Sequence, residues 1–161
     1  MNLTLTLMTA ACFAISIAIA TKLSKGDWLW LVGKPELMDT KESRKRSGKK
    51  SSKGKKELAY TAVTIKSAVR AAWVYVAAGV TFLSFLFIDF AKQSDMEALN
   101  VVAWVINTAG LVAFTMLLIW TIGSRMRDTG RKPTLSMDED GRLLTLLLAI
   151  AVMVVVVALL S

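Results

Sequence analysis

The side chains that most often carry chemistry are scarce in this chain of 161 residues. It has no histidine, and Cys12 is its one cysteine, so the commonest general base and metal ligand is absent and no intrachain disulfide can form. The sequence offers no cluster of metal ligands, no nucleophile paired with a base and no glycine-rich phosphate loop. We therefore expect a protein that is not an enzyme and that uses no cofactor and no metal.

Polar side chains within the long apolar stretches are few and uncharged. Asn107 is the only strongly polar side chain well inside such a stretch, and Thr81 and Ser84 lie midway along another. The chemistry open to them is hydrogen bonding between helices, worth about 1 kcal/mol per bond in a membrane. We expect Asn107 to pack one helix on another.

Positive charge is the second feature with chemical consequences. The formal net charge is +8, and the segment from Lys22 to Arg70 alone carries +9, with 14 basic and five acidic residues, so the rest of the chain sums to −1. A basic run close to a membrane attracts anionic headgroups, at about 1 kcal/mol per residue near the surface. We expect lipid or partner contact by this run: Arg44, Lys45, Arg46, Lys49, Lys50, Lys53, Lys55 and Lys56. The alternative is that the charge serves only to orient the chain. Nucleic acid is disfavoured, because no aromatic residues interleave with the basic run.

Two tryptophans precede that run. Trp28 and Trp30 lie in the apolar segment 26–33, which is too short to cross a bilayer. An indole at the headgroup boundary keeps its ring in apolar surroundings and its N–H near water. We expect both to contact lipid as an interfacial anchor; a re-entrant or ligand-binding hairpin is the alternative.

Four uncharged stretches are long enough to cross a bilayer. They cover about 1–21, 71–88, 98–124 and 143–161. At about 1.5 Å per residue, 20 helical residues span the hydrocarbon core of roughly 30 Å. All four are expected to be helices, because an unpaired strand in lipid leaves its backbone groups without partners. The sequence therefore predicts an all-α membrane protein, a single integral membrane domain covering 1–161.

The distribution of lysine and arginine indicates the orientation. Basic residues concentrate in 22–70 and in 125–142, whereas the short turn 89–97 is mostly acidic. Positive loops stay in the cytosol. We expect a multi-pass protein of the cell (inner) membrane, with loops 22–70 and 125–142 cytosolic and both termini outside.

Spacing predicts how the helices pack. Apolar residues recur at three- and four-residue steps from Leu58 to Ala72, which indicates an amphipathic helix that leads into the second span as one continuous helix over 57–88. Small residues four apart let helices approach closely. Such residues are Ala10, Ala14 and Ala18 on one face of the first span and Cys12, Ser16 and Ala20 on another, with Ala109, Gly110 and Ala113 as a matching face on the third.

The segments Leu29 to Gly33 (LWLVG) and Leu37 to Glu42 (LMDTKE) carry a family resemblance. They resemble a short motif in a family of small uncharacterised bacterial multi-pass membrane proteins, related in outline to immunity and signalling proteins that accompany secreted toxins. Pro35 and Glu36 stand where that family has an aromatic-Asn pair, and the long basic insert is unlike it. The resemblance implies a bacterial inner membrane and carries over no catalytic residue.

These observations favour a small membrane protein that acts as an accessory or scaffold subunit or as an immunity-type protein. Its expected partners are anionic membrane lipids and either a protein partner or a second copy, with no nucleic acid. An oligomeric small-solute transporter or pore is one alternative, and a lipid-modifying membrane enzyme is another. A proton-coupled exporter of the small four-helix multidrug type is excluded, because the first span has no carboxylate.

Overall fold

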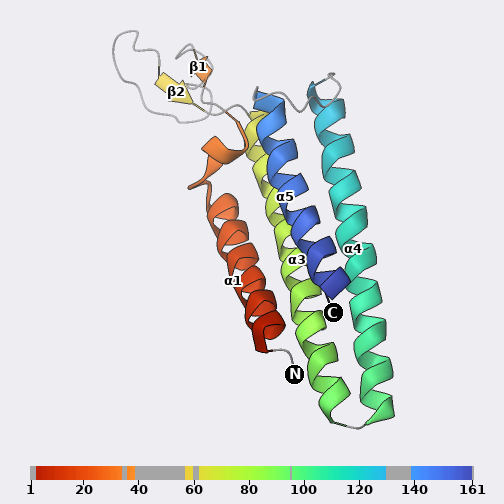
Figure 1. Cartoon of the computed structure of the whole chain (residues 1–161). Coiled ribbons are helices and arrows are strands. Elements are labelled where there is room, and N and C mark those ends of the chain that lie inside the picture. Colours follow the sequence, from red (N-terminus) through yellow and green to blue (C-terminus); the bar gives the residue numbers. More distant parts are fainter. Residues whose placement is uncertain are drawn as a thin grey trace.

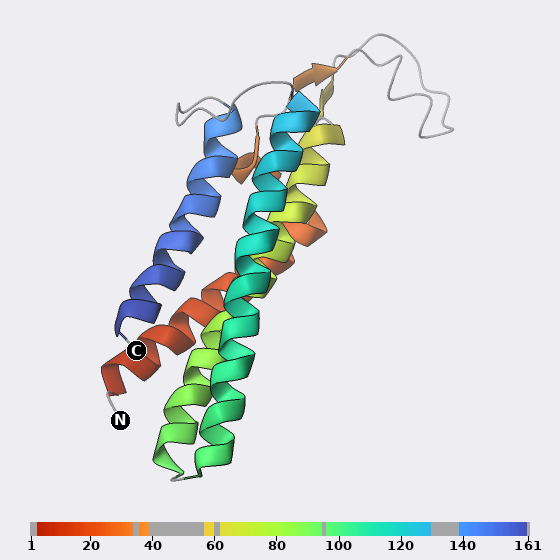
Figure 2. The same ribbon diagram turned by 90° about the vertical axis from the view of Figure 1, so that its right-hand side faces the viewer.

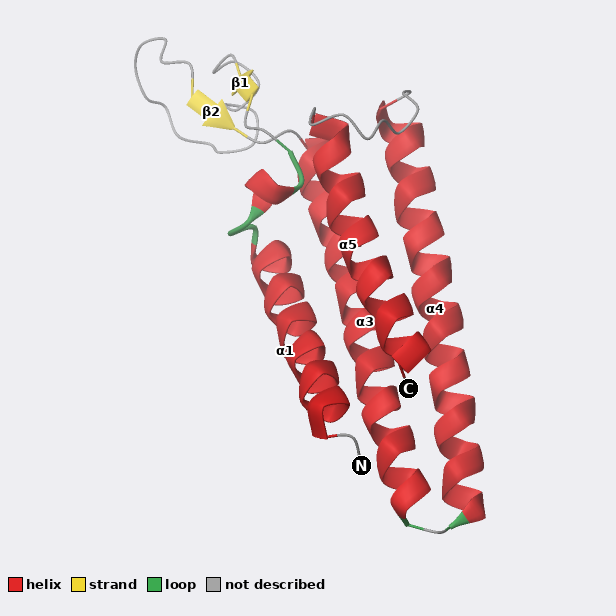
Figure 3. Ribbon diagram, in the orientation of Figure 1, coloured by secondary structure: helices red, strands yellow, loops and turns green. Residues whose placement is uncertain are grey.

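The fold is known from a computed structural model of the chain. It describes residues 3–33, 36–38, 57–59, 62–94, 96–129 and 139–160. The four long helices in these ranges are α1 (Leu3–Lys25), α3 (Ala62–Gln93), α4 (Glu97–Thr129) and α5 (Glu139–Leu160). The shorter elements are a 3₁₀ turn, η1 (Leu29–Leu31), and two strands, β1 (Glu36–Met38) and β2 (Glu57–Ala59). Figure 3 shows helices, strands and loops in separate colours.

The prediction of four helices long and apolar enough to cross a membrane is confirmed. The helices extend beyond the uncharged stretches because helix propensity continues into their polar flanks. α3 has 32 residues and α4 has 33, so each is about 48–50 Å long at 1.5 Å per residue. That length exceeds the roughly 30 Å of a hydrocarbon core, so in a bilayer either helix would extend its polar ends beyond the core or tilt.

The structure departs from the sequence-based expectation where the second long helix begins. We expected a continuous helix over 57–88, but Glu57–Ala59 forms β2 and the helix starts at Ala62. β2 pairs antiparallel with β1, with Glu36 opposite Ala59 and Met38 opposite Glu57. This pairing joins residues about 20 positions apart, so the local spacing of apolar residues does not reveal it.

α3 is the central helix of the bundle. It packs against α1, α4 and α5, whereas the main contacts of α1 and α5 besides α3 are with each other. Figure 1 shows α3 behind α5 and between α1 and α4, and Figure 2 shows α1 crossing the bundle at a steep angle. The start of α1, the end of α5 and the α3–α4 turn lie toward one end, and the strand pair lies at the other.

Small residues on α3 allow this close packing. Ala68, Ala71, Ala78 and Gly79 are among its buried positions, with Phe82 as the largest fully buried side chain. A Cβ atom on Gly79 would lie 3.0 Å from Cδ1 of Ile17. α1 therefore approaches α3 over a glycine, as helices in membranes commonly do. The expected match between α1 and the small residues of α4 is wrong, because α1 packs chiefly on α3.

α1 ends in a Schellman motif that redirects the chain. Gly26 has φ +79°, a left-handed conformation that glycine adopts without strain. The Gly26 N–H donates to the Leu23 carbonyl and the Asp27 N–H to the Lys22 carbonyl, at 3.2 and 3.0 Å. The chain then turns at η1 and places Val32 and Gly33 in the bundle, where Gly33 lies against Thr64.

Candidate functional site: the polar seam and the basic end of the bundle

A short polar seam joins α3 to α4 midway along their length. Ser84 Oγ lies 2.8 Å from Oδ1 of Asn107 and 2.7 Å from the carbonyl oxygen of Thr81, and its single hydroxyl proton is shared between these two acceptors. Asn107 is 2% exposed, and both Thr81 and Ser84 are buried. Gly110, one turn along, faces Thr81, where an added Cβ would be 3.3 Å from the hydroxyl oxygen. Asn107 and Gly110 therefore lie where α4 meets α3.

The seam consists of neutral groups, which suit helix packing better than catalysis. In the described parts of the chain, no three His, Cys, Asp or Glu side chains gather as metal ligands would. Other hydroxyls in the helices mostly donate to carbonyls of their own helix; Ser16 donates to Cys12 and Thr115 to Leu111. Such bonds satisfy the hydroxyl without help from another helix. The chemistry of the seam is thus interhelical hydrogen bonding.

α5 is tied to α3 by a phenol. The Tyr75 hydroxyl donates to the carbonyl oxygen of Leu146 at 2.8 Å, and Tyr75 is 3% exposed. A buried tyrosine hydroxyl nearly always finds a partner, because leaving it unpaired in apolar surroundings is costly. This bond therefore places α5 along the length of α3, beside the apolar row Leu143, Leu147, Ile150, Val154 and Val157 that α5 buries.

Charged side chains gather at the end of the bundle that carries the strand pair. Arg70 of α3 binds the Asp128 carboxylate of α4 at 2.7 Å, and its guanidinium lies 5.4 Å from the centre of the Trp120 ring. Arg125 donates to Ser67 Oγ at 2.9 Å. Lys66 and Arg125 also act electrostatically on Asp128. Three cations thus surround one carboxylate, and this group is called the basic-end cluster below: Lys66, Arg70, Arg125 and Asp128.

The two tryptophans expected at the lipid boundary lie in different surroundings. Trp28 is half-buried against the hydrophobic core, whereas Trp30 is 54% exposed. The Trp30 carbonyl accepts a hydrogen bond from Arg142 at 3.1 Å, which links the η1 turn to the start of α5. Of the other expected contacts, Arg44, Lys45, Arg46, Lys49, Lys50, Lys53, Lys55 and Lys56 lie outside the described residues.

The small residues of α1 divide between two faces. Ser16 and Ala20 are buried, and Cys12 is half-buried beside the core. Ala10, Ala14 and Ala18 are exposed on the opposite face. Within one chain, therefore, the face of α1 with Cys12, Ser16 and Ala20 packs on the bundle, and the face with Ala10, Ala14 and Ala18 does not.

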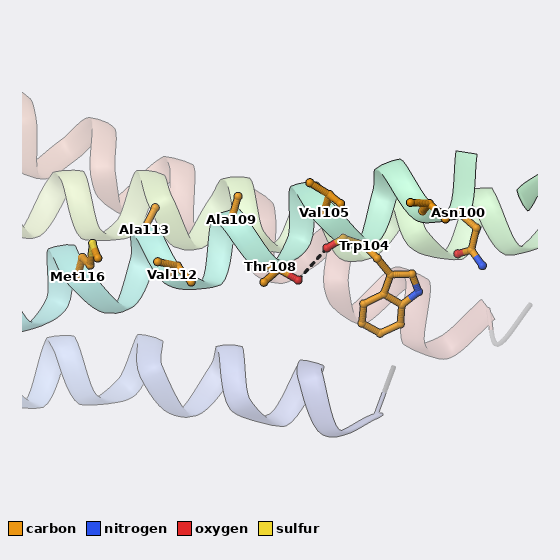
Figure 4. A pocket seen from close by; sticks show the side chains of 9 residues that line it. Asn100, Trp104, Val105, Thr108, Ala109, Val112, Ala113 and Met116 are labelled. Carbon is orange, nitrogen blue, oxygen red and sulfur yellow. Dashed lines mark hydrogen bonds between the residues drawn. The ribbon is translucent and has the colours of Figure 1, made fainter. Parts of the chain in front are cut away.

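Two grooves run along the described parts of the helices. The larger, about 770 Å³, lies on α4 between Asn100 and Met116 and includes Thr108, whose hydroxyl donates to the Trp104 carbonyl at 2.9 Å. Figure 4 shows these side chains along α4. The smaller, about 410 Å³, lies between α1 and α3 and includes Trp73. Both are lined mainly by apolar side chains.

Comparison with protein families, curated proteins and solved structures gives no match.

Sequence reasoning missed the basic-end cluster and the groove between α1 and α3. Arg70 and Asp128 are 58 positions apart, so only the antiparallel packing of α3 on α4 brings them together. A signal was present in the sequence, since Arg70 and Trp73 flank the start of one span and Trp120 and Arg125 flank the end of the next. Tryptophan beside arginine at a span boundary is typical of an interfacial site.

Proposed function

We propose that this chain is an integral protein of the cell (inner) membrane that acts as an accessory or scaffold subunit or as an immunity-type protein, without enzymatic activity. Its basic segment, 22–70, lies in the cytosol and contacts anionic lipid or a partner protein. Both termini lie outside, in agreement with the concentration of basic residues in 22–70 and 125–142.

The observation that carries this proposal is the use of polar groups inside the bundle. Among the described residues, Asn107 pairs with Ser84 and Tyr75 with a backbone carbonyl. A transporter or pore needs polar groups turned toward a path for its solute. Here the described grooves lie along the helices and are apolar. The arrangement therefore favours a function in which the outer surface of the bundle binds lipid or a partner protein.

The rival transporter or pore is tested by permeability. The purified full chain is reconstituted in liposomes loaded with ions and a small fluorescent solute, and protein-free liposomes serve as the control. We expect equal leakage from both, because the bundle interior is packed. Leakage that rises with the amount of protein would contradict the proposal and favour an oligomeric pore.

The rival lipid-modifying enzyme is tested by membrane lipid composition. Cells that lack the chain are compared with cells that overproduce it, by mass spectrometry of total lipids. A scaffold leaves the set of lipid species unchanged, because it makes and breaks no covalent bonds. A lipid species that disappears in one strain and accumulates in the other would show catalysis and would overturn the proposal.

A further inference from the structure

The groove between α1 and α3 has the character of a slot for hydrocarbon. α1 contributes Ile17, Thr21 and Ser24, and α3 contributes Val69, Trp73 and Val76. The two hydroxyls are already used: Thr21 donates to the Ile17 carbonyl at 2.7 Å and Ser24 to the Thr21 carbonyl at 2.9 Å. The groove thus presents mainly apolar atoms, and both of its hydroxyl groups already donate a hydrogen bond.

The end of this groove nearest the strand pair is positively charged. Lys66 precedes Trp73 by seven residues, or two helical turns, so both lie on the same side of α3. Lys66 belongs to the basic-end cluster, in which Arg70 takes the Asp128 carboxylate at 2.7 Å. Three cations to one carboxylate leave an excess of two positive charges among the described side chains there. An anion placed beside Lys66 would complement that excess.

Trp73 lies inside the apolar groove, two turns from Lys66, with the groove residue Val69 between them. It is 59% exposed, lines the apolar groove and lies three residues beyond Arg70. Indoles prefer the depth at which acyl chains meet the headgroup. From one end to the other, α3 therefore presents the cation of Lys66 and then the apolar groove, in which the indole of Trp73 lies between Val69 and Val76.

From this order we infer that the chain binds one anionic diacyl phospholipid from the leaflet at its basic end. An acyl chain lies in the groove between α1 and α3 against the Trp73 ring, and the headgroup phosphate lies at Lys66. The inference rests on the membrane insertion of the proposed function, but it requires neither a scaffold role nor a protein partner.

Native mass spectrometry of the full chain in mild detergent tests the site. The protein is titrated with phosphatidylglycerol and with phosphatidylcholine of the same acyl chains. One phosphatidylglycerol should remain bound, with an affinity at least five-fold above that of phosphatidylcholine, as expected for one close basic residue. Equal affinity for the two lipids would overturn the inference and indicate only a general lipid-facing surface.

Two pairs of variants locate the lipid. Lys66→Gln should reduce the preference for phosphatidylglycerol about five-fold. Arg127→Gln is the matched control. It removes an equal charge at the same end, on the side of α4 turned away from α3, and should leave the preference unchanged.

Val69→Trp fills the groove between α1 and α3 and should weaken the binding of both lipids. Val112→Trp places the same ring in the α4 groove and is the matched control, which should leave lipid binding unchanged. Val69 and Val112 are 42% and 50% exposed, so both variants should fold.

Full lipid binding by Val69→Trp, or equal losses in Lys66→Gln and Arg127→Gln, would contradict the assigned site. These outcomes are separate from failure of the proposed function. Leakage from liposomes or a changed set of cellular lipids would overturn the scaffold role and leave the bound phospholipid in place. Conversely, a chain that binds no lipid in detergent but leaves liposomes sealed would keep the scaffold role and lose the site.

Discussion

At the scale of residues, Ser84 is one of the few polar side chains buried in the bundle, and its position between two helices is closely defined. Its hydroxyl carries one proton but lies 2.7 Å from the Thr81 carbonyl and 2.8 Å from the Asn107 amide. That single proton is shared between the two acceptors. Any sliding of α4 along α3 would break this arrangement, so the pair fixes the register of the two helices.

Replacing Asn107 should therefore lower stability. Asn107→Ala removes the bond to Ser84 and leaves space at a site that is 2% exposed, so we expect a loss of about 1–2 kcal/mol. Thermal unfolding in detergent measures it. Thr108→Ala is the matched control, because Thr108 is exposed and donates to its own helix. Equal melting temperatures for wild type and Asn107→Ala would contradict the role of the seam.

At the scale of elements, α1 illustrates a choice that sequence alone leaves open. Both of its small-residue faces have the four-residue spacing of a packing surface. The structure places the face with Ser16 and Ala20 against the bundle and leaves Ala10, Ala14 and Ala18 exposed. The partner decides between them, because Gly79 of α3 leaves room for Ile17 and Phe13.

This packing predicts opposite results for two substitutions that each add one leucine. Gly79→Leu should lower the melting temperature in detergent, because even a Cβ there would lie 3.0 Å from Ile17. The rest of a leucine side chain would push α1 away from α3. Ala14→Leu should leave the melting temperature of the single chain unchanged, since Ala14 is exposed. The opposite pattern would mean that α1 packs by its other face.

At the scale of the whole molecule, the fold and the charge distribution agree on one arrangement. The α3–α4 turn lies at the same end as the start of α1 and the end of α5 (Figure 1). Arg70, Arg125 and Arg142 lie at the other end, where Arg142 reaches the η1 turn. A single insertion direction therefore places all of these cations on one side of a membrane, which is the cytosolic side in the proposed topology.

Cysteine labelling tests that direction. In a Cys12→Ser background, Met96→Cys should react with a membrane-impermeant maleimide added outside intact spheroplasts, because Met96 lies in the α3–α4 turn and is 61% exposed. Arg127→Cys is the control from the other end and should react only after the membrane is permeabilised. Labelling of Arg127→Cys in intact spheroplasts, with Met96→Cys protected, would reverse the proposed topology.

The four helices and the charge of their flanks could be predicted from sequence, because hydrocarbon length and the cost of burying charge act on each segment separately. The polar role of Asn107 was also visible, since an amide in an apolar stretch needs a partner. Its partner Ser84, the strand pair at 36–38 and 57–59, the basic-end cluster and the groove beside Trp73 were not. Each depends on which faces of distant helices meet, and only the tertiary packing around α3 settles that choice.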